Sequence, residues 1–402
     1  MPDERFDVVI IGAGPAGSRT AAVAAANGFS VLVLEKRERI GYPVRCAEAV
    51  GPRIDVERFL ELEDRLISSP VNGAIVFAPD GTKFKAKMPG VGFVIDRELF
   101  DQSLADIAGK NGAVVRTSSQ VMGLIEEDGR IAGVKVKDLE NDTDYTVGAR
   151  IVVGADGIEA ISPRWAGLRR AFGLDEIFSC AEFTVEGIEL EPDGPFIEFH
   201  LGRRFAPGGY AWVFPKGPSS ANVGVGVKPS MTNGKKAIDF LGDFLEHRCP
   251  GARVKRTIVG GCGAARELQS LATDGFLVVG EAANHNNPFS GGGIINALEA
   301  ADIAGGVICE ALGENDTSAG RLSVYTKKWK KSVGRNNTLF YHAAEIFYRL
   351  EDAEMDRMIR RLTSTPGIIG EKGVKPLKML LVLGAGNPKI MFKVIGALIK
   401  KR

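Results

Sequence analysis

Three glycines and one glutamate near the N-terminus have the spacing of a nucleotide-binding site. Gly12, Gly14 and Gly17 form a G-x-G-x-x-G turn, and Glu35 follows 18 residues after Gly17. The first glycine permits a tight turn, the second lets backbone N–H groups approach a pyrophosphate, and the third lets a helix pack closely. The Glu35 carboxylate can accept hydrogen bonds from ribose hydroxyls. Together these residues predict a dinucleotide site.

The residues around this turn supply the elements that such a site requires. An apolar run at 6–11 predicts a strand, an alanine-rich run at 18–27 predicts a helix, and residues 31–34 predict a second strand. The N-terminus of that helix offers partial positive charge to phosphates. We include Ala16, within the turn, among the cofactor-binding candidates. The strand–turn–helix–strand context makes the motif much more specific than the glycines alone.

A second motif follows the apolar strand expected at 276–279. It contains Glu281 and the glycines at 291–293, and a helix is expected from Ile294 to 312. The pattern resembles the C-terminal flavin motif of the FAD-dependent hydroxylase and reductase superfamily. The resemblance implies FAD, with Glu281 (where Asp is usual) on the ribityl chain. It also implies that Gly292, Gly293 and Ile294 point a helix N-terminus at the flavin.

Three features between these motifs are weaker candidates for cofactor contacts. Arg97 opens a helix expected after Asp96, where a cation is unfavourable for the helix dipole and should have an anionic partner. The superfamily resemblance places Arg97 near FAD and Val121 against the adenine. Residues 154–157 resemble the superfamily's mid-chain motif. Taken alone they fit an ordinary Asp-Gly turn equally well, but their order among the other motifs favours a direct or indirect role at the cofactor.

Two further motifs narrow the resemblance. Residues 43–48 read Pro-Val-Arg-Cys-Ala-Glu, residues 210–216 read Tyr-Ala-Trp-Val-Phe-Pro-Lys, and residues 221–227 read Ala-Asn-Val-Gly-Val-Gly-Val. With the flavin motifs, this set looks like the geranylgeranyl reductase family over roughly residues 5–310. The resemblance implies saturation of C=C bonds in prenyl chains of archaeal ether-lipid precursors. It also places Arg45, Cys46, Ala47 and Ala49 beside the flavin, the two alanines standing where the family usually has glycines.

The implied reaction needs a proton donor and an apolar surface. Under the resemblance, Cys46 is the candidate catalytic acid, because a thiol with a pKa near ~8.5 is mostly protonated at neutral pH. Period-two geometry puts Tyr210, Trp212 and Phe214 on one face of a strand. This face is either a substrate-binding floor or an ordinary half-buried sheet face. His285, beside the flavin motif, is either a proton donor or a structural histidine.

Composition excludes several other classes of protein. The chain has 402 residues, 45% hydrophobic and 25% charged, so disorder should not dominate. Five scattered cysteines without a C-x-x-C argue against a zinc ribbon or cysteine-ligated cluster, so we expect no metal. So few cysteines also fit the reducing environment of the cytoplasm. The net charge of +1 gives no indication of nucleic-acid binding. The N-terminus does not resemble a signal peptide, and no 18-residue apolar run occurs.

The C-terminal residues differ from the rest of the chain in charge. The last 31 residues carry eight Lys or Arg and no acid, a net charge of +8. Because the whole chain carries +1, the residues before them carry a net charge of −7. Residues 390–399 with their flanking lysines could form a basic amphipathic helix on an anionic membrane, or a helix docked on the protein. The lipid substrate implied above favours peripheral contact with the cytoplasmic membrane face.

The fold class expected is α/β (α+β overall): a Rossmann-like FAD-binding domain, an antiparallel-sheet substrate domain and a C-terminal helical region. We assign residues 1–72, 93–175 and 256–315 to the FAD-binding domain and residues 73–92 and 176–255 to the substrate domain. Residues 316–402 form the C-terminal helical region.

The leading functional hypothesis is the FAD-dependent reductase with an isoprenoid lipid substrate. Because no second G-x-G-x-x-G occurs, electrons would come from transiently bound NADPH or from a ferredoxin-like protein. The alternative is a flavin-dependent halogenase or monooxygenase, whose Trp-x-Trp-x-Ile-Pro resembles residues 210–215. A flavoprotein that carries electrons to quinone is a third class, but it usually needs an iron–sulfur domain.

Overall fold

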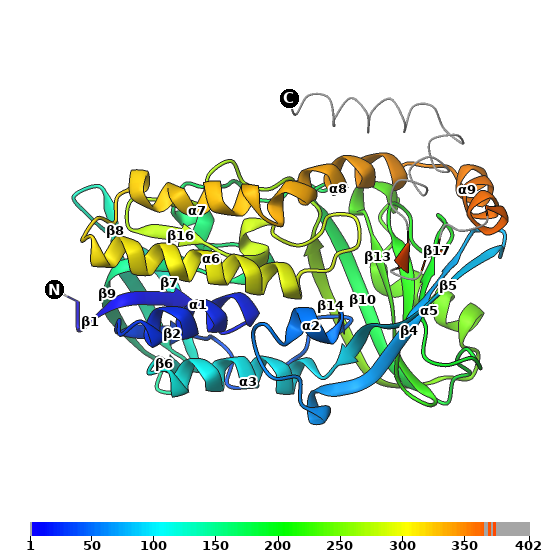
Figure 1. Ribbon diagram of the computed structural model, residues 1–402, viewed down its shortest axis with the longest axis horizontal. Helices are drawn as coiled ribbons and strands as arrows, with labels where there is room; N and C mark the ends of the chain where they lie inside the picture. The colour runs from blue at the N-terminus through cyan, green and yellow to red at the C-terminus, as the bar shows by residue number, and fades with distance from the viewer. Residues whose placement is uncertain (1, 366–368, 371–372, 375–402) are drawn as a thin grey trace.

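The computed structural model describes residues 2–365, 369–370 and 373–374, most of which lie in or around two mixed sheets (Figure 1). The first sheet holds the N-terminal glycine turn. Its strands are β1 (Glu4–Ile11), β2 (Val31–Leu34), β6 (Val114–Arg116), β7 (Ser119–Glu127), β8 (Arg130–Asp138), β9 (Thr143–Gly154), β15 (Ala272–Thr273) and β16 (Phe276–Val278).

The centre of the first sheet is parallel, in the order β16-β9-β1-β2-β6. Val8 on β1 pairs with Val31 on β2 and with Ile151 on β9, and all three are fully buried or nearly so. Three helices lie side by side along this sheet, with α1 in contact with both others: α1 (Pro15–Ala26), α3 (Arg97–Lys110) and α6 (Ile294–Gly313). This arrangement confirms the Rossmann-like fold expected from the N-terminal motif.

The second sheet is antiparallel except where β11 pairs with β4, and its order is β14-β10-β13-β12-β11-β4-β5-β3. Helix α5 (Ala237–Arg248) covers one face with Phe240, Leu241 and Phe244. The strands are β3 (Ala49–Val50), β4 (Ile67–Phe77), β5 (Lys83–Ile95), β10 (Ile177–Glu186), β11 (Ile197–His200), β12 (Tyr210–Gly217), β13 (Ser220–Val227) and β14 (Arg253–Gly263). Strands β3, β4 and β14 therefore carry this sheet beyond the expected segments 73–92 and 176–255.

Up to residue 365 the C-terminal region is helical as expected, with α7 (Ala319–Lys331), α8 (Gly334–Phe347) and α9 (Asp352–Ser364). Trp329 of α7 is buried in the core of the first sheet, whereas Met355 and Ile359 of α9 pack beside the second sheet. A short pair, β17 (Ile369–Gly370) and β18 (Gly373–Val374), follows. The basic amphipathic helix expected at 390–399 lies outside the described residues.

Short elements complete the fold. They are α2 (Arg53–Val56), α4 (Ser162–Trp165) and four 3-10 turns, η1 (Asp64–Leu66), η2 (Gly157–Glu159), η3 (Pro229–Met231) and η4 (Gly280–Ala283). Within the described part of the chain, every helix is too short or too polar to cross a bilayer.

Candidate active site

A cavity of about 670 Å³ brings residues from both sheets together. It is within the size range of small-molecule and cofactor sites. Residues distant in sequence line it, from the glycine turn, the Cys46 loop, β10, β12, β14 and the start of α6. All but one of the candidate site residues line it, namely Gly12, Gly14, Ala16, Glu35, Arg45, Cys46, Ala47, Ala49, Arg97, Val121, Tyr210, Trp212, Phe214, Glu281, Gly292, Gly293 and Ile294.

The remaining candidate, Gly17, lies behind the glycine turn in close packing. A Cβ at Gly17 would overlap the carbonyl oxygen of Gly12, whereas a Cβ at Gly14 would meet no protein atom within 4 Å. Gly12 has a φ of +103°, which favours glycine. In this turn Gly12 therefore allows the backbone conformation, Gly14 leaves space at the cavity, and Gly17 allows close packing.

Glu35 lies at the end of β2 with its carboxylate at the cavity. It accepts hydrogen bonds from the backbone N–H of Ala13 (3.0 Å) and of Arg37 (2.9 Å). These two bonds fix the carboxylate beside the glycine turn and leave lone pairs for a further donor.

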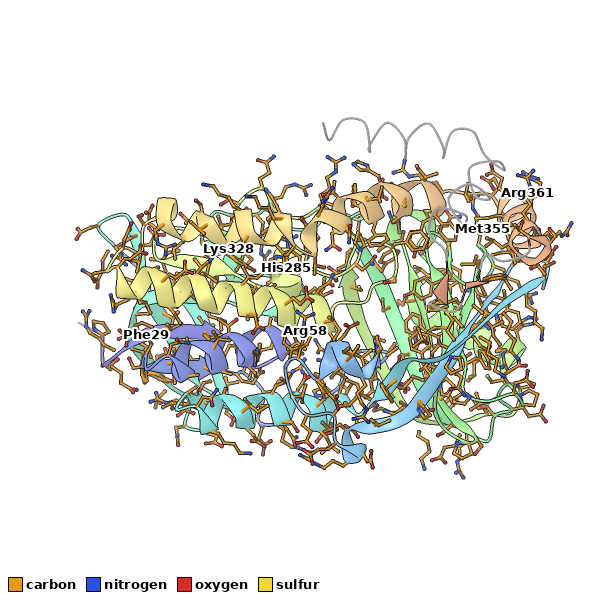
Figure 2. The ribbon with its side chains drawn as sticks, viewed as in Figure 1. Phe29, Arg58, His285, Lys328, Met355 and Arg361 are labelled. Atoms are coloured by element: carbon orange, nitrogen blue, oxygen red, sulfur yellow. The ribbon has the colours of Figure 1, made fainter. Side chains whose placement is uncertain are left out.

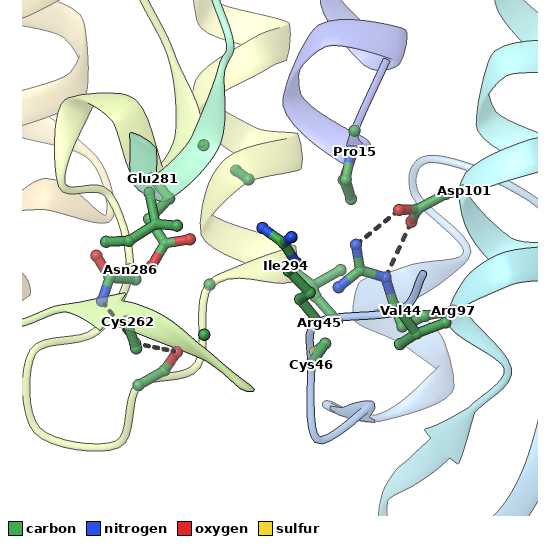
Figure 3. A pocket seen from close by; sticks show the side chains of 18 of the residues that line it. Pro15, Val44, Arg45, Cys46, Arg97, Asp101, Cys262, Glu281, Asn286 and Ile294 are labelled. Atoms are coloured by element: carbon green, nitrogen blue, oxygen red, sulfur yellow. Dashed lines mark hydrogen bonds and ion pairs between the residues drawn. The ribbon is translucent and has the colours of Figure 1, made fainter. Parts of the chain in front are cut away.

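Glu281 of the second flavin motif lies across the cavity from Arg97 and Asp101 (Figure 3). Helix α6 begins at Ile294 after Gly293, and no side chain caps its first turn. Glu281, on η4, accepts a hydrogen bond from the backbone N–H of Gly263 at 3.0 Å. Burial raises the pKa of the Glu281 carboxyl, and the Gly263 hydrogen bond opposes the rise.

Cys46 lies in the loop after β2, in an apolar environment below Arg45 in Figure 3. Burial raises the pKa of the Cys46 thiol, and the nearby Arg97 guanidinium opposes the rise. Arg97 itself forms a two-pronged ion pair with Asp101 at 2.9 and 2.7 Å, which supplies the anionic partner expected for a cation at this helix start. The thiol is therefore the stable form at neutral pH.

Glu48 fixes the conformation of this loop, although sequence reasoning gave it no role. It is buried with a left-handed φ of +71°, and its backbone N–H donates to the Cys46 sulfur at 3.2 Å. Its carboxylate accepts from the Arg97 backbone N–H (3.0 Å), from the Asn222 amide (2.6 Å) and from the Lys216 ammonium. The loop is therefore tied to α3, β12 and β13 at once.

The aromatic side chains of β12 form the floor of the cavity. Tyr210, Trp212 and Phe214 all face it, while the intervening Ala211 and Val213 pack under α5. The predicted period-two arrangement is therefore confirmed, and the face that carries the aromatic side chains lines the cavity. Phe199 of β11 extends this floor through edge contacts with Tyr210 and Phe214.

Two features beside the motifs have structural explanations. Asp156 accepts hydrogen bonds from the backbone N–H groups of Ile161 and Ser162, so its carboxylate organises a turn at the cavity edge. His285 lies under α7 (Figure 2), where its ring packs at a tilt against Trp329, and its Nδ1 accepts from the Gly280 N–H. Burial lowers the pKa of His285 to about 3, so the ring is neutral and supports the η4 turn from behind.

Comparison with known proteins connects this arrangement to a family. Residues 7–178 match the family model of FAD-dependent oxidoreductases, and residues 176–265 match that of the geranylgeranyl reductase catalytic domain. The chain is 37% identical over 395 residues to the digeranylgeranylglycerophospholipid reductase of Methanocella arvoryzae, covering 97% of this chain and 98% of that one. The corresponding reductase of Methanosarcina mazei is 36% identical over 396 residues, covering 97% and 95%.

The chain belongs to the geranylgeranyl reductase family. It is an FAD-dependent oxidoreductase, as the family models and the full-length relatives show. A geranylgeranyl bacteriochlorophyll reductase-like protein of Thermoplasma acidophilum has the same fold (TM-score 0.89, 30% identity, 98% of this chain and 99% of that one). A flavin-dependent brominase shares the fold alone, with a TM-score of 0.73 at 18% identity over 99% of this chain and all of that one.

The geranylgeranyl reductase site fits FAD on observations independent of these names. The N-termini of α1 and α6 both open into the cavity, and neither has a side-chain cap. One suits the pyrophosphate and the other the electron-rich edge of the flavin. The carboxylates of Glu35 and Glu281 line the same cavity and could accept hydrogen bonds from ribose and ribityl hydroxyls. In the described part of the chain, no cluster of His, Cys, Asp and Glu could hold a metal ion.

Three carboxylates at or beside the geranylgeranyl reductase cavity were missed from the sequence. Glu48, Asp101 and Glu182 are all buried, and each pairs with a residue from another turn or strand. For Asp101 the signal was present, since Arg97 and Asp101 have the i,i+4 spacing of a helical ion pair. For Glu48 and Glu182 the partners are distant in sequence, so no local pattern identifies them.

Proposed function

We propose that this protein saturates isolated C=C bonds in the geranylgeranyl chains of archaeal ether-lipid precursors. One observation carries the proposal: the aromatic floor of β12 faces the same cavity as the FAD-binding elements and Cys46. A long apolar chain lying on this floor would share the cavity with the Cys46 thiol and with the residues that would hold FAD. The names of the relatives that match nearly the whole chain support this substrate class.

An isolated alkene has no carbonyl group to stabilise charge, so reduction needs a hydride at one carbon and a proton at the other. Reduced FAD, when bound, supplies the hydride. We assign the proton to the Cys46 thiol, which burial keeps protonated. Tyr210, Trp212 and Phe214 hold the chain by apolar contact, and exclude water from the reacting carbons.

The physiological partners of this reaction are further proposals. Electrons would come from NADPH binding transiently or from a ferredoxin-like protein. The lipid would be reached from the cytoplasmic membrane face, with the basic C-terminal residues in contact with the surface.

An anaerobic turnover assay tests the function. The FAD-loaded protein is reduced chemically without oxygen and mixed with a geranylgeranyl glycerophospholipid, and the product is analysed by mass spectrometry. We expect a gain of two hydrogens for each double bond reduced. Product that instead gains oxygen or halogen, and only in air, would support the halogenase or monooxygenase alternative.

The assignment of Cys46 is tested separately with Cys46→Ser. We expect a loss of turnover of about 100-fold, in the range of a removed general acid, with FAD content unchanged. Turnover equal to that of the unmodified enzyme at full FAD occupancy would exclude an essential role for the thiol.

A further inference from the structure

Glu182 is a buried acid on the floor of the cavity that the reaction above does not use. It lies on β10, where Phe178, Cys180 and Glu182 face the cavity and Ala181 faces the core under α5. Only 5% of its surface is exposed. A carboxyl group in this position needs either an ionic partner or a proton.

Burial and the missing partner of one carboxyl oxygen indicate that Glu182 is protonated. Its Oε2 accepts from the indole N–H of Trp212 at 3.0 Å, and its buried Oε1 has no partner among the described residues. Trp212 reaches it across β13 because Gly224 has no side chain: a Cβ there would overlap the indole. An unpartnered buried oxygen costs more in a charged carboxylate than in a neutral carboxylic acid.

The groups around Glu182 include some that raise its pKa and some that lower it. Burial raises its pKa to about 8, and the Glu48 carboxylate contributes to the rise. The Trp212 hydrogen bond opposes it, as do Arg256 on β14 and Lys216 on β12. The acid is therefore mostly protonated at neutral pH, with a pKa close enough to neutrality for it to give up the proton.

Cys46 lines the same cavity and needs a new proton after each reduction. Once it gives its proton to an alkene carbon, a thiolate remains in a site that the lipid closes to water. Burial disfavours that thiolate, although Arg97 partly stabilises it. A second reduction therefore needs a proton from inside the cavity.

We propose that Glu182 is the proton reservoir that restores the Cys46 thiol between successive reductions, an inference that rests on the function proposed above. In the first step the S–H bond breaks as a C–H bond forms, while the hydride and its electron pair come from reduced FAD. In the second step the Glu182 O–H bond breaks and the S–H bond re-forms, with no electron transfer. The carboxylate keeps the Trp212 N–H and regains a proton when the cavity opens to solvent.

Infrared spectroscopy of the FAD-loaded protein without substrate tests the neutral acid directly. Subtracting the Glu182→Gln spectrum should leave one carboxylic-acid C=O band at pH 7, which disappears as the pH rises through about 8. In Trp212→Phe the band should persist to higher pH, because a hydrogen bond that favours the carboxylate is gone. Absence of the band from the unmodified protein at pH 7 would overturn the proposal.

Kinetics then separate a reservoir from a direct acid. With FAD reduced in advance, Glu182→Gln should reduce the first double bond at nearly the normal rate, since Cys46 starts protonated. Later reductions under continuous electron supply should slow about 100-fold. Loss of the first reduction as well, or unchanged later reductions, would each contradict the reservoir. FAD content and thermal stability of the variant control for misfolding.

Glu198→Gln provides a matched control. Glu198 is a buried glutamate on β11, but it faces away from the cavity and pairs with Arg248 at 2.8 and 2.5 Å. This variant should lose stability yet keep the normal ratio of first to later reductions. If the unmodified enzyme reduces no lipid, the function proposed above fails, whereas the infrared band still reports independently on the protonation of Glu182.

Discussion

At the scale of single residues, two glycines of the FAD-binding turn have different surroundings, so that one matters for cofactor binding and the other for folding. Gly14 opens onto the cavity, where a methyl group would meet no protein atom, while Gly17 packs against the carbonyl of Gly12. The same substitution at the two positions therefore acts on different free energies.

We expect Gly14→Ala to fold normally but to bind FAD about 10- to 100-fold more weakly, because its methyl group occupies the approach of the pyrophosphate. Gly17→Ala should lower the free energy of unfolding of the FAD-free protein by about 1–3 kcal/mol through overpacking. Thermal unfolding without FAD and flavin fluorescence titration measure the two effects. Equal stability loss in both variants would contradict this division.

The raised pKa of Glu182 also has a consequence for stability. Between pH 4.5, its ordinary pKa, and about 8, the native state holds a proton that the unfolded chain has lost. The free energy of unfolding therefore falls as the pH rises through this window. Relative to Glu182→Gln, the unmodified protein should lose about 2–4 kcal/mol from pH 5 to 8. Denaturant unfolding at several pH values measures this difference, and parallel curves for the two proteins would contradict it.

At the scale of elements, the contact between α1 and α6 sets the position of both helix N-termini at the cavity. Gly305 of α6 lies against Val23 of α1, where an added Cβ would be 2.6 Å from a Val23 methyl carbon. The two helices approach this closely because Gly305 has no side chain. Gly306, the next residue, has no neighbour within 4 Å of such a Cβ.

We expect Gly305→Ala to lower the free energy of unfolding by about 1–2 kcal/mol and to weaken FAD binding, because the helices must separate. Gly306→Ala is the matched control and should stabilise the protein by about 0.5–1 kcal/mol, since alanine is the better helix former. Chemical denaturation of both variants gives the comparison. A stabilising Gly305→Ala would show that the helices adjust without cost.

Local sequence patterns were sufficient for the elements around the glycine turn and for the start of α3. The runs around Gly12 and Gly17 predicted β1, α1 and β2, and Asp96 caps α3 as expected, accepting from the Leu99 N–H. Helix α1 starts at Pro15, earlier than expected, because proline suits the first helical position.

The interior of the site was less predictable, because it depends on contacts between distant strands. Nothing near Glu48 in the sequence indicates Lys216 or Asn222, which come together only when β12 and β13 pair over the loop. Likewise, Trp212 and Glu182 are 30 residues apart and meet across Gly224. Family resemblance placed Cys46 and the aromatic strand, but not the polar groups between them.

At the scale of the whole molecule, the C-terminal helices hold the two sheets together. Helix α7 packs on α6 and buries Trp329 in the core of the first sheet. Helix α9 packs on β5, and the backbone N–H of Asp80, in the turn before β5, donates to Asp356 at 3.0 Å. Between them, Tyr348 donates to the carbonyl of Phe289 next to the cavity. The basic residues beyond position 371 follow this scaffold in sequence.

We expect these basic residues to bind anionic membranes. A chain ending at Glu371 loses eight positive charges and should float less with anionic liposomes than the full chain, by about 1 kcal/mol per lysine or arginine near the surface. Neutral liposomes provide the control, and flotation of both proteins should be low there. Equal flotation of the two chains on anionic liposomes would exclude the membrane-binding tail.

The three bonds of the Glu48 carboxylate couple the two sheets mechanically. One bond goes to the first turn of α3 beside the first sheet, and the other two go to β12 and β13 in the second. If one sheet rotates relative to the other so that the cavity widens, these bonds must break or the loop that carries Glu48 must move with the sheet. Cys46, two residues away, would then move with the wall, so that admission of a long lipid and placement of the thiol become a single motion.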